Sequence, residues 1–397
     1  MLALILILGA VAWAVCLPLS ALMRYVSLRM GLVDQPGSEA HKSAPAGWGG
    51  RPRPSPVPNT GGIAVFAAIA WPMLAVLLGV WLIPEAFWAA VPGGEVVLEH
   101  RAGLQATSQI GGGILVALAI MHLLGVYDDR RALGPGVKLS AQIAVAACLV
   151  GFCDIRVLSF LEGPELGLRP MLGSMMVFLI SLVWIVVVTN AMNFLDNMDG
   201  LATGVGLVAG GLYLAATLLG GQWFVAGLAA LLCGSLLAFW GFNLPPAKMY
   251  LGDGGSLVIG LLLAVISVRT TYINLPVEPG GFGEPQVLAP AVGWYGALMP
   301  VLVLAVPLYD FTSVTLIRIL NGKSPFTGDH NHFSHRLLRR GLTKRKALAV
   351  ILLTALATGL GGVMLSALEG WQAAVVATQA AAVLAVLALL ESDKRQI

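Results

Sequence analysis

Long apolar segments recur along the whole chain, and they limit its fold more than any other feature. A bilayer core is about 30 Å thick, so a helix needs roughly 20 apolar residues to cross it. Eleven segments approach that length: 2–23, 62–83, 107–127, 138–153, 174–193, 201–219, 223–241, 254–273, 291–317, 347–367 and 372–391. With 58% hydrophobic and only 11% charged residues, the chain is too apolar for a water-soluble protein. The sequence predicts an all-α polytopic membrane protein with about 10–11 transmembrane helices.

The even spread of these segments predicts one integral-membrane domain, residues 1–397. The first segment lacks a small-residue cleavage site, so we expect it to be retained as a helix and not removed as a signal peptide. The stretches expected to form cytoplasmic loops are about 24–61, 128–137, 194–200, 242–253 and 318–346.

Lysine and arginine are divided unevenly between the two sides of the predicted membrane domain. If the loop after the first segment is cytoplasmic, 19 of the 23 basic residues are cytoplasmic and 4 are outside. Basic residues favour the cytoplasmic side of a membrane. The sequence therefore predicts an N-terminus outside and a C-terminus in the cytoplasm.

Four polar motifs fall on the same predicted side as the basic residues. They are HLLGVYDDRRALGPGVKLSAQ (122–142), TNAMNFLDNMDGLATG (189–204), NLPPAKMYLGDGGS (243–256) and NGKSPFTGDHNHFSHRLLRRGLTKRK (321–346). The outer loops carry scattered glutamates but no comparable cluster. Because a chance distribution would place motifs on both sides, we expect one active site on the cytoplasmic face.

Three aspartates lie at the ends of predicted spans. A carboxylate at membrane depth costs about 2.5–3.5 kcal/mol on insertion scales and is usually paired or functional. Asp128 and Asp129 are adjacent, so we expect a cation nearby; a solvated helix end with Arg130 and Arg131 as counter-charges is the alternative. Asp253 lies between glycines before a span, where it can cap a helix or hold Mg²⁺ against phosphates.

The second motif carries a row of asparagines. Asn190, Asn193 and Asn197 are spaced to share one face of a helix, with Asp196 and Asp199 on the neighbouring face. Such amides can simply cap the interior of a helix bundle. They can also offer oxygen atoms to a metal ion or hydrogen-bond donors to a nucleobase.

The last motif combines histidines with arginines. His330, His332 and His335 lie within six residues, and no cysteine supports a structural zinc site there. Histidine next to arginine suits an anionic phosphate better. The RRGLTKRK run that follows is interpreted as a basic stretch beside anionic lipid.

Together the motifs predict Mg²⁺-dependent phosphoryl transfer between a lipid phosphate and a soluble nucleotide-linked donor. The alternative from another class is an ion-coupled secondary transporter, which predicts charged groups near span centres and a repeat between halves. The motif carboxylates lie at span ends, and spans 1–5 do not resemble spans 6–10. A non-catalytic scaffold gives no reason to collect the aspartates on one side.

The ordered motifs resemble those of the polyprenyl-phosphate N-acetylhexosamine-1-phosphate transferases. The matching stretches are GLVDQP with NTGGIAVF, GVYDDR with a lysine nine residues past the DD, NAMNFLDNMDGLA and YLGDGGS. SPFTGDHNHFSHRLL followed by GLTKRKA resembles the loop of the branch that transfers GlcNAc-1-phosphate. It does not resemble the His-His-His-Phe loop of the muramoyl-pentapeptide-phosphate branch, the alternative within the family.

The resemblance implies a reaction in which undecaprenyl phosphate displaces UMP from a UDP-N-acetylhexosamine at the bacterial inner membrane. It implies Mg²⁺, with Mn²⁺ as a substitute, and no nucleic acid; a direct attack and a covalent aspartyl intermediate both remain open. Membrane lipid is an expected partner, and no motif decides whether a homodimer forms.

The resemblance also assigns roles to residues of the catalytic centre. Asn193 and Asp253 would bind Mg²⁺. Asp128 would deprotonate or orient the lipid phosphate, with Asp129 beside it, and Lys138 would contact the diphosphate.

Further residues are expected to bind the donor. Asp196 and Asp199 would border the uridine pocket, and Tyr250 would stack on uracil. His332 and His335 would line the sugar-diphosphate pocket. The chain departs from the family pattern where it carries Asn197 for a glycine, His330 for an arginine and Ser334 for a histidine.

Overall fold

The computed structural model describes residues 1–34, 56–91, 93–162, 170–270, 297–325, 331–365, 368 and 370–391. These residues are almost entirely helical. The helices are α1 (Leu2–Met30), α2 (Gly61–Leu82), α3 (Glu85–Ala90), α4 (Gly94–Ala106), α5 (Ser108–Asp128), α6 (Pro135–Phe152), α7 (Pro170–Leu195), α8 (Leu201–Leu219), α9 (Trp223–Asn243), α10 (Asp253–Arg269), α11 (Met299–Val303), α12 (Ala305–Leu320), α13 (Phe333–Arg339), α14 (Lys344–Met364) and α15 (Gly370–Glu391).

Among the described residues, nine helices are long and apolar enough to cross a membrane. They correspond to nine of the eleven predicted spans. The predicted span 254–273 appears as α10, which has only 17 residues. The predicted span 291–317 differs more, because its described part is two helices, α11 and α12, interrupted at Leu304. The prediction of a polytopic all-α membrane protein is confirmed, whereas its sidedness stays a prediction.

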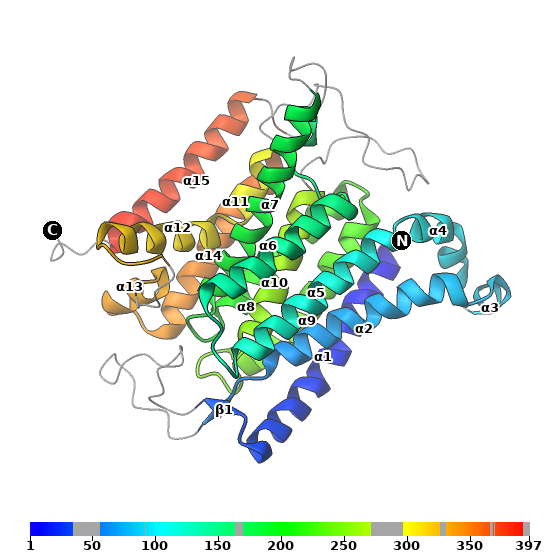
Figure 1. Ribbon diagram of the computed structural model, residues 1–397, viewed down its shortest axis with the longest axis horizontal. Helices are drawn as coiled ribbons and strands as arrows, with labels where there is room; N and C mark the ends of the chain where they lie inside the picture. Colours follow the sequence, from blue (N-terminus) through cyan, green and yellow to red (C-terminus); the bar gives the residue numbers. More distant parts are fainter. Residues whose placement is uncertain are drawn as a thin grey trace.

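The long helices lie side by side in a common direction, with α12 inclined to them (Figure 1). Helix α10 is apolar on all sides and packs against α2, α5 and α7, so every residue from Gly254 to Val268 is buried. Helices α1 and α15 instead expose many large apolar side chains, which suits contact with lipid. The centre of the fold is therefore the helix that begins with Asp253.

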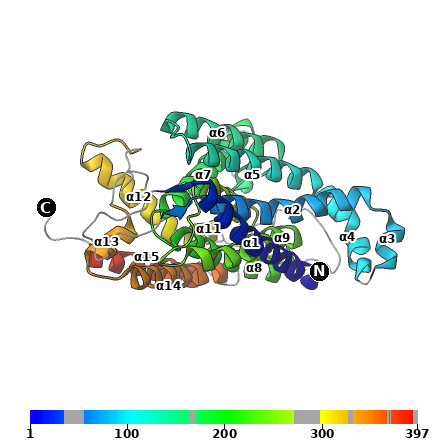
Figure 2. The ribbon, with the colours of Figure 1, turned by 90° about the horizontal axis from the view of Figure 1, so that it is seen from below.

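The helix ends that carry the polar motifs lie at one end of the bundle. The strands β1 (Val33–Asp34) and β2 (Val57–Pro58) pair antiparallel there, and α13 lies on the same side of the bundle (Figure 1); Figure 2 shows α13 at the end away from α3 and α4. Helices α3 and α4 lie at the opposite end of the bundle. Several stretches predicted as loops are helical, since α1 continues to Met30 and α12 to Leu320.

Two glycines let the site-bearing elements approach one another closely. A Cβ atom on Gly125 would lie 2.4 Å from the carbonyl carbon of Asp253, and one on Gly62 would lie 2.3 Å from the nitrogen of Gly255. The start of α2 is also bonded to the chain before α10, since the Gly61 nitrogen donates to the Tyr250 carbonyl at 3.0 Å. The end of α5 and the starts of α2 and α10 thus form one rigid junction.

Candidate active site

A lysine ammonium lies between two carboxylates at this junction. The Nζ of Lys138 donates to Oδ2 of Asp128 at 2.6 Å and to Oδ2 of Asp253 at 2.9 Å. The lysine comes from the first turn of α6, and the acids are the last residue of α5 and the first residue of α10. The expected cation beside the aspartates is therefore present, and it is Lys138.

The turn between α5 and α6 brings this lysine back toward Asp128. The Oδ1 of Asp128 accepts the backbone N–H of Leu133 at 2.7 Å, which closes the turn. Pro135 then starts α6, a position where its missing N–H is not needed. Asp128 thus shapes the turn with one oxygen and holds Lys138 with the other.

Asp129 faces different partners from its neighbour. Its carboxylate accepts the backbone N–H groups of Asp253 at 3.0 Å and Gly254 at 3.2 Å, and the amide of Asn59 at 3.2 Å. The first N–H groups of a helix have no partner inside the helix, and an acid there also complements the helix dipole. Asp129 therefore caps α10 from another segment and places the backbone that carries Asp253.

We expect Asp129→Ala to lower turnover about 100-fold by displacing Asp253, since small misplacements of a reacting group have that effect. Loss of the cap should also destabilise the fold by about 1–2 kcal/mol. Steady-state kinetics and thermal unfolding of the purified protein measure both effects. Asp129→Asn, which keeps one acceptor oxygen, should show a smaller loss, and equal losses in the two variants would contradict the capping role.

The three asparagines of the second motif point to three different places. Asn193 donates through Nδ2 to Oδ1 of Asp253 at 3.1 Å and to Oγ of Ser256 at 2.8 Å. Asn190 is bonded to Gln142 of α6, and Asn197 is bonded to the carbonyl of its own helix end. Only Asn193 of this row reaches the acid centre.

The residues predicted to border uridine are buried. Oδ2 of Asp199 accepts the N–H of Ala247 at 3.3 Å and lies 3.8 Å from Nζ of Lys344. Asp196 is also buried, and Tyr250 packs in a small cluster with Ala247. The roles of these residues in binding uridine stay predictions.

The histidine motif reaches the same end of the bundle through a buried aspartate. Nδ1 of His332 lies 2.8 Å from Oδ2 of Asp310, whose Oδ1 accepts the N–H of Phe333 at 2.5 Å. The ring of His335 lies 6.3 Å from that of His332. His330 falls outside the described residues.

Sequence reasoning missed Asp310. It is fully buried in α12, within the predicted span 291–317, and it belongs to none of the four polar motifs. The available signal was a single acid within the apolar run VPLYDFTSV. A buried carboxylate needs hydrogen-bond partners, and Asp310 finds them in the histidine motif.

Phe194 joins the histidines to the acid centre. It follows Asn193 in α7, and its ring meets that of His332 edge-on at 5.7 Å between centroids. Ser334 also donates to Oδ1 of Asn197 at the end of α7. The polar motifs, far apart in sequence, therefore meet at one end of the bundle.

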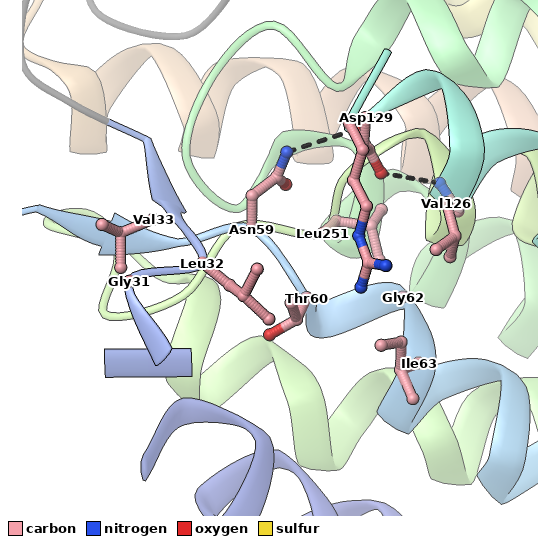
Figure 3. Close-up of a pocket in the computed structure, with 12 residues that line it drawn as sticks. Gly31, Leu32, Val33, Asn59, Thr60, Gly62, Ile63, Val126, Asp129 and Leu251 are labelled. Carbon is pink, nitrogen blue, oxygen red and sulfur yellow. Dashed lines mark hydrogen bonds between the residues drawn. The ribbon is translucent and has the colours of Figure 1, made fainter. Parts of the chain in front are cut away.

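A cavity of about 320 Å³ adjoins this centre (Figure 3). Asp129 and Asn59 form one side of it, and Leu32, Thr60 and Ile63 lie across from them. Asp129 thus lines the cavity and also caps the start of the helix that carries Asp253.

The acid centre has a donor set that suits a hard divalent cation. Mg²⁺ in phosphoryl-transfer sites takes one or two carboxylates and completes its shell with phosphate oxygens and water. Asp253 and Asn193 are in contact, and the Lys138 ammonium bonds both Asp253 and Asp128. In the part of the chain that the structure describes, no three His, Cys, Asp or Glu side chains form a metal cluster. Substrate oxygens would have to complete the coordination of an ion here.

Comparison with known proteins identifies relatives across most of the chain. The family model for glycosyl transferase family 4 matches residues 112–271, which include Asp128, Lys138, Asn193 and Asp253. A probable undecaprenyl-phosphate N-acetylglucosaminyl 1-phosphate transferase of Bacillus subtilis is 26% identical over 89% of this chain and 82% of its own length. A decaprenyl-phosphate N-acetylglucosaminephosphotransferase of Mycobacterium leprae is 31% identical over 75% of this chain and 71% of its own. A phospho-N-acetylmuramoyl-pentapeptide-transferase of Limosilactobacillus fermentum is 32% identical over only 40% of this chain.

Proposed function

The chain belongs to glycosyl transferase family 4, within the polyprenyl-phosphate N-acetylhexosamine-1-phosphate transferases, and on that premise we propose that it transfers GlcNAc-1-phosphate from a UDP-sugar to undecaprenyl phosphate. UMP is the second product. The relatives named for N-acetylglucosaminyl phosphate transfer match most of this chain, which supports this donor over the muramoyl-pentapeptide one.

The contact of Lys138 with both Asp128 and Asp253 carries this proposal. In the net reaction, a phosphate oxygen of the lipid forms a bond to the sugar-bearing phosphorus. The bond from that phosphorus to the bridging oxygen breaks, and UMP leaves with the electron pair. Two phosphate groups must approach each other, so catalysis depends on positioning and on neutralising their charge. Lys138 supplies a positive charge, and Asp128 orients the lipid phosphate or takes its proton.

Asn193 and Asp253 are proposed to hold Mg²⁺, with Mn²⁺ as a substitute. The ion would neutralise negative charge on the diphosphate of the donor. Ser256 supports this pair from the first turn of α10, because its hydroxyl accepts from Nδ2 of Asn193. Asp129 supports it from the other side by capping the same helix.

The donor is proposed to lie between the acid centre and the histidine helix. His332 and His335 would line the sugar-diphosphate pocket, and Asp196 and Asp199 would border uridine. The basic residues in the predicted cytoplasmic loops support a site on the cytoplasmic face of the bacterial inner membrane, where a nucleotide sugar is available.

Tyr250→Ala should raise the KM for the UDP-sugar about 10-fold and leave kcat nearly unchanged. Base stacking on an aromatic ring contributes about 1–3 kcal/mol, and it is similar in the ground and transition states. Initial rates at varied donor concentration give the two constants, and Tyr250→Phe is the matched control that keeps the ring. An unchanged KM in the alanine variant would place the base elsewhere.

UMP release by the purified, detergent-solubilised protein tests the proposed function. Undecaprenyl phosphate and Mg²⁺ are supplied with UDP-GlcNAc, UDP-GalNAc or UDP-MurNAc-pentapeptide in separate reactions, and EDTA is added as a control. We expect release with UDP-GlcNAc that requires both the lipid and the metal. Release only with the muramoyl donor would move the protein to the other branch, and no release with any of the three donors would overturn the proposed reaction with these donors.

A further inference from the structure

The last described helix ends on an acid that is turned into the protein. Glu391 is the only charged residue of α15, and only 8% of its surface is exposed. Its neighbours Leu389 and Leu390 are 74% and 62% exposed. Outward-facing leucines are expected of a helix in contact with lipid. A buried carboxylate such as Glu391, in contrast, needs a partner inside the protein.

That partner is an arginine of the histidine helix. Nη2 of Arg336 in α13 lies 3.0 Å from Oε1 of Glu391, and the hydroxyl of Tyr309 in α12 donates to the same oxygen. Nη2 of Arg336 also donates to Oγ of Ser313 at 2.7 Å. Figure 1 shows the end of α15 beside α12 and α13, so the cluster joins three helices.

The stability of the fold alone does not explain why Arg336 and Glu391 are paired in a buried cluster. Arg336 and Glu391 are both buried, and neither Nε of Arg336 nor Oε2 of Glu391 has a hydrogen-bond partner among the described residues. A buried ion pair with incomplete hydrogen bonding often stabilises a fold less than apolar residues of the same volume. Its directional contacts do, however, specify one orientation of the helices that it joins.

Helix α13 depends on such contacts. It has seven residues, and an isolated helix of that length is not stable in water. Asp310 holds its start through the His332 ring and the N–H of Phe333. Arg336 follows one turn later, since its N–H donates to the His332 carbonyl at 2.9 Å. Glu391 is the acid that pairs with Arg336 in this second turn.

We propose that Glu391 is a positioning residue which, through Arg336, sets the rotation of α13 and so presents His332 and His335 to the diphosphate of the donor. The inference rests on the proposed function for the identity of the donor. It assigns α15, whose sequence carries no motif of the active site, a part in building that site.

Glu391→Gln tests the proposal, because it removes the charge and keeps the side-chain volume. The KM for UDP-GlcNAc should rise about 10-fold, while kcat and the KM for the lipid acceptor change less than about twofold. Leu390→Ala, an outward-facing neighbour on the same helix, is the matched control and should leave all three constants unchanged. An unchanged donor KM in Glu391→Gln would overturn the proposal.

A charge swap separates orientation from a general loss of structure. Arg336→Glu combined with Glu391→Arg restores the ion pair and should bring the donor KM back to within about threefold of the wild type. Failure of the swap to restore it would assign the effect to Arg336 itself and overturn the proposal. Arg336→Met with Glu391→Leu removes both charges and should fold even if Glu391→Gln does not. A wild-type donor KM in that variant would also count against the proposal.

Hydrogen exchange of the backbone amides of α13 gives a readout that needs no substrate. Exchange across residues 333–339 should accelerate in Glu391→Gln and return toward the wild-type rate in the charge swap. If this occurs but the wild-type protein releases no UMP, the proposed function fails and the positioning of α13 by Glu391 stands. Unchanged exchange in Glu391→Gln would overturn the positioning role independently of the reaction.

Discussion

Asp253→Asn is expected to lower UMP release by about 1,000-fold, the size of effect seen when one preorganised electrostatic contact is lost. The substitution keeps the size of the side chain and removes its charge. In the wild-type protein the two carboxylate oxygens meet Nζ of Lys138 and Nδ2 of Asn193 at 2.9 and 3.1 Å. An amide cannot accept from both groups with the same strength, and it is a weaker ligand for Mg²⁺.

The measurement is UMP release over a Mg²⁺ titration, together with thermal unfolding. Residual activity should need more Mg²⁺ than the wild-type enzyme, while the unfolding temperature changes little. Asp154→Asn is the control, because Asp154 follows the far end of α6 and its side chain is 72% exposed. Wild-type turnover in Asp253→Asn would remove Asp253 from the catalytic centre.

Lys138→Met should lower turnover by about 100-fold or more, because the ammonium is the cation that pairs with both acids. Without it, Asp128 and Asp253 repel each other, and the two phosphate groups of the reaction lose a neutralising charge. The variant should also gain more thermal stability from added Mg²⁺ than the wild type does, since a divalent cation can then screen the acids.

Lys138→Arg is the informative control for this prediction. Arginine keeps the positive charge but replaces a compact ammonium with a planar group, so it should recover stability better than activity. UMP release and thermal unfolding with and without Mg²⁺ distinguish the two effects. Full turnover in Lys138→Met would restrict the lysine to a structural role.

The membrane architecture could be predicted because its signal is local. Nine of the eleven apolar segments became helices long enough to cross a bilayer, with ends near the predicted ones. Two predicted segments differ in the described residues. One is interrupted at Leu304 between α11 and α12, and the other appears as α10, with 17 residues from Asp253 to Arg269. Hydropathy over a window cannot show such breaks.

The candidate site was predicted as a set of residues but not as a set of contacts. Helical spacing predicted Asn190, Asn193 and Asn197 on one helix face, but α7 ends at Leu195, so Asn197 lies in the turn beyond it, and each amide has a different partner. The partners come from α6, from α10 and from the end of α7 itself. Spacing along one helix specifies a face, whereas the neighbours of that face depend on how the other helices pack.

The amino-acid sequence by itself determined that the chain is a helical membrane protein and that its polar motifs follow or precede apolar spans. Both properties depend on the length and composition of short segments, which the bilayer thickness converts into helices. Only the tertiary structure decided that Lys138 pairs Asp128 with Asp253, that Asp129 caps α10, and that Glu391 reaches Arg336. The partners in these contacts include residues more than 100 positions apart, such as Asp129 and Asp253. They meet because glycines and small residues let particular helices pack closely, which no local pattern specifies.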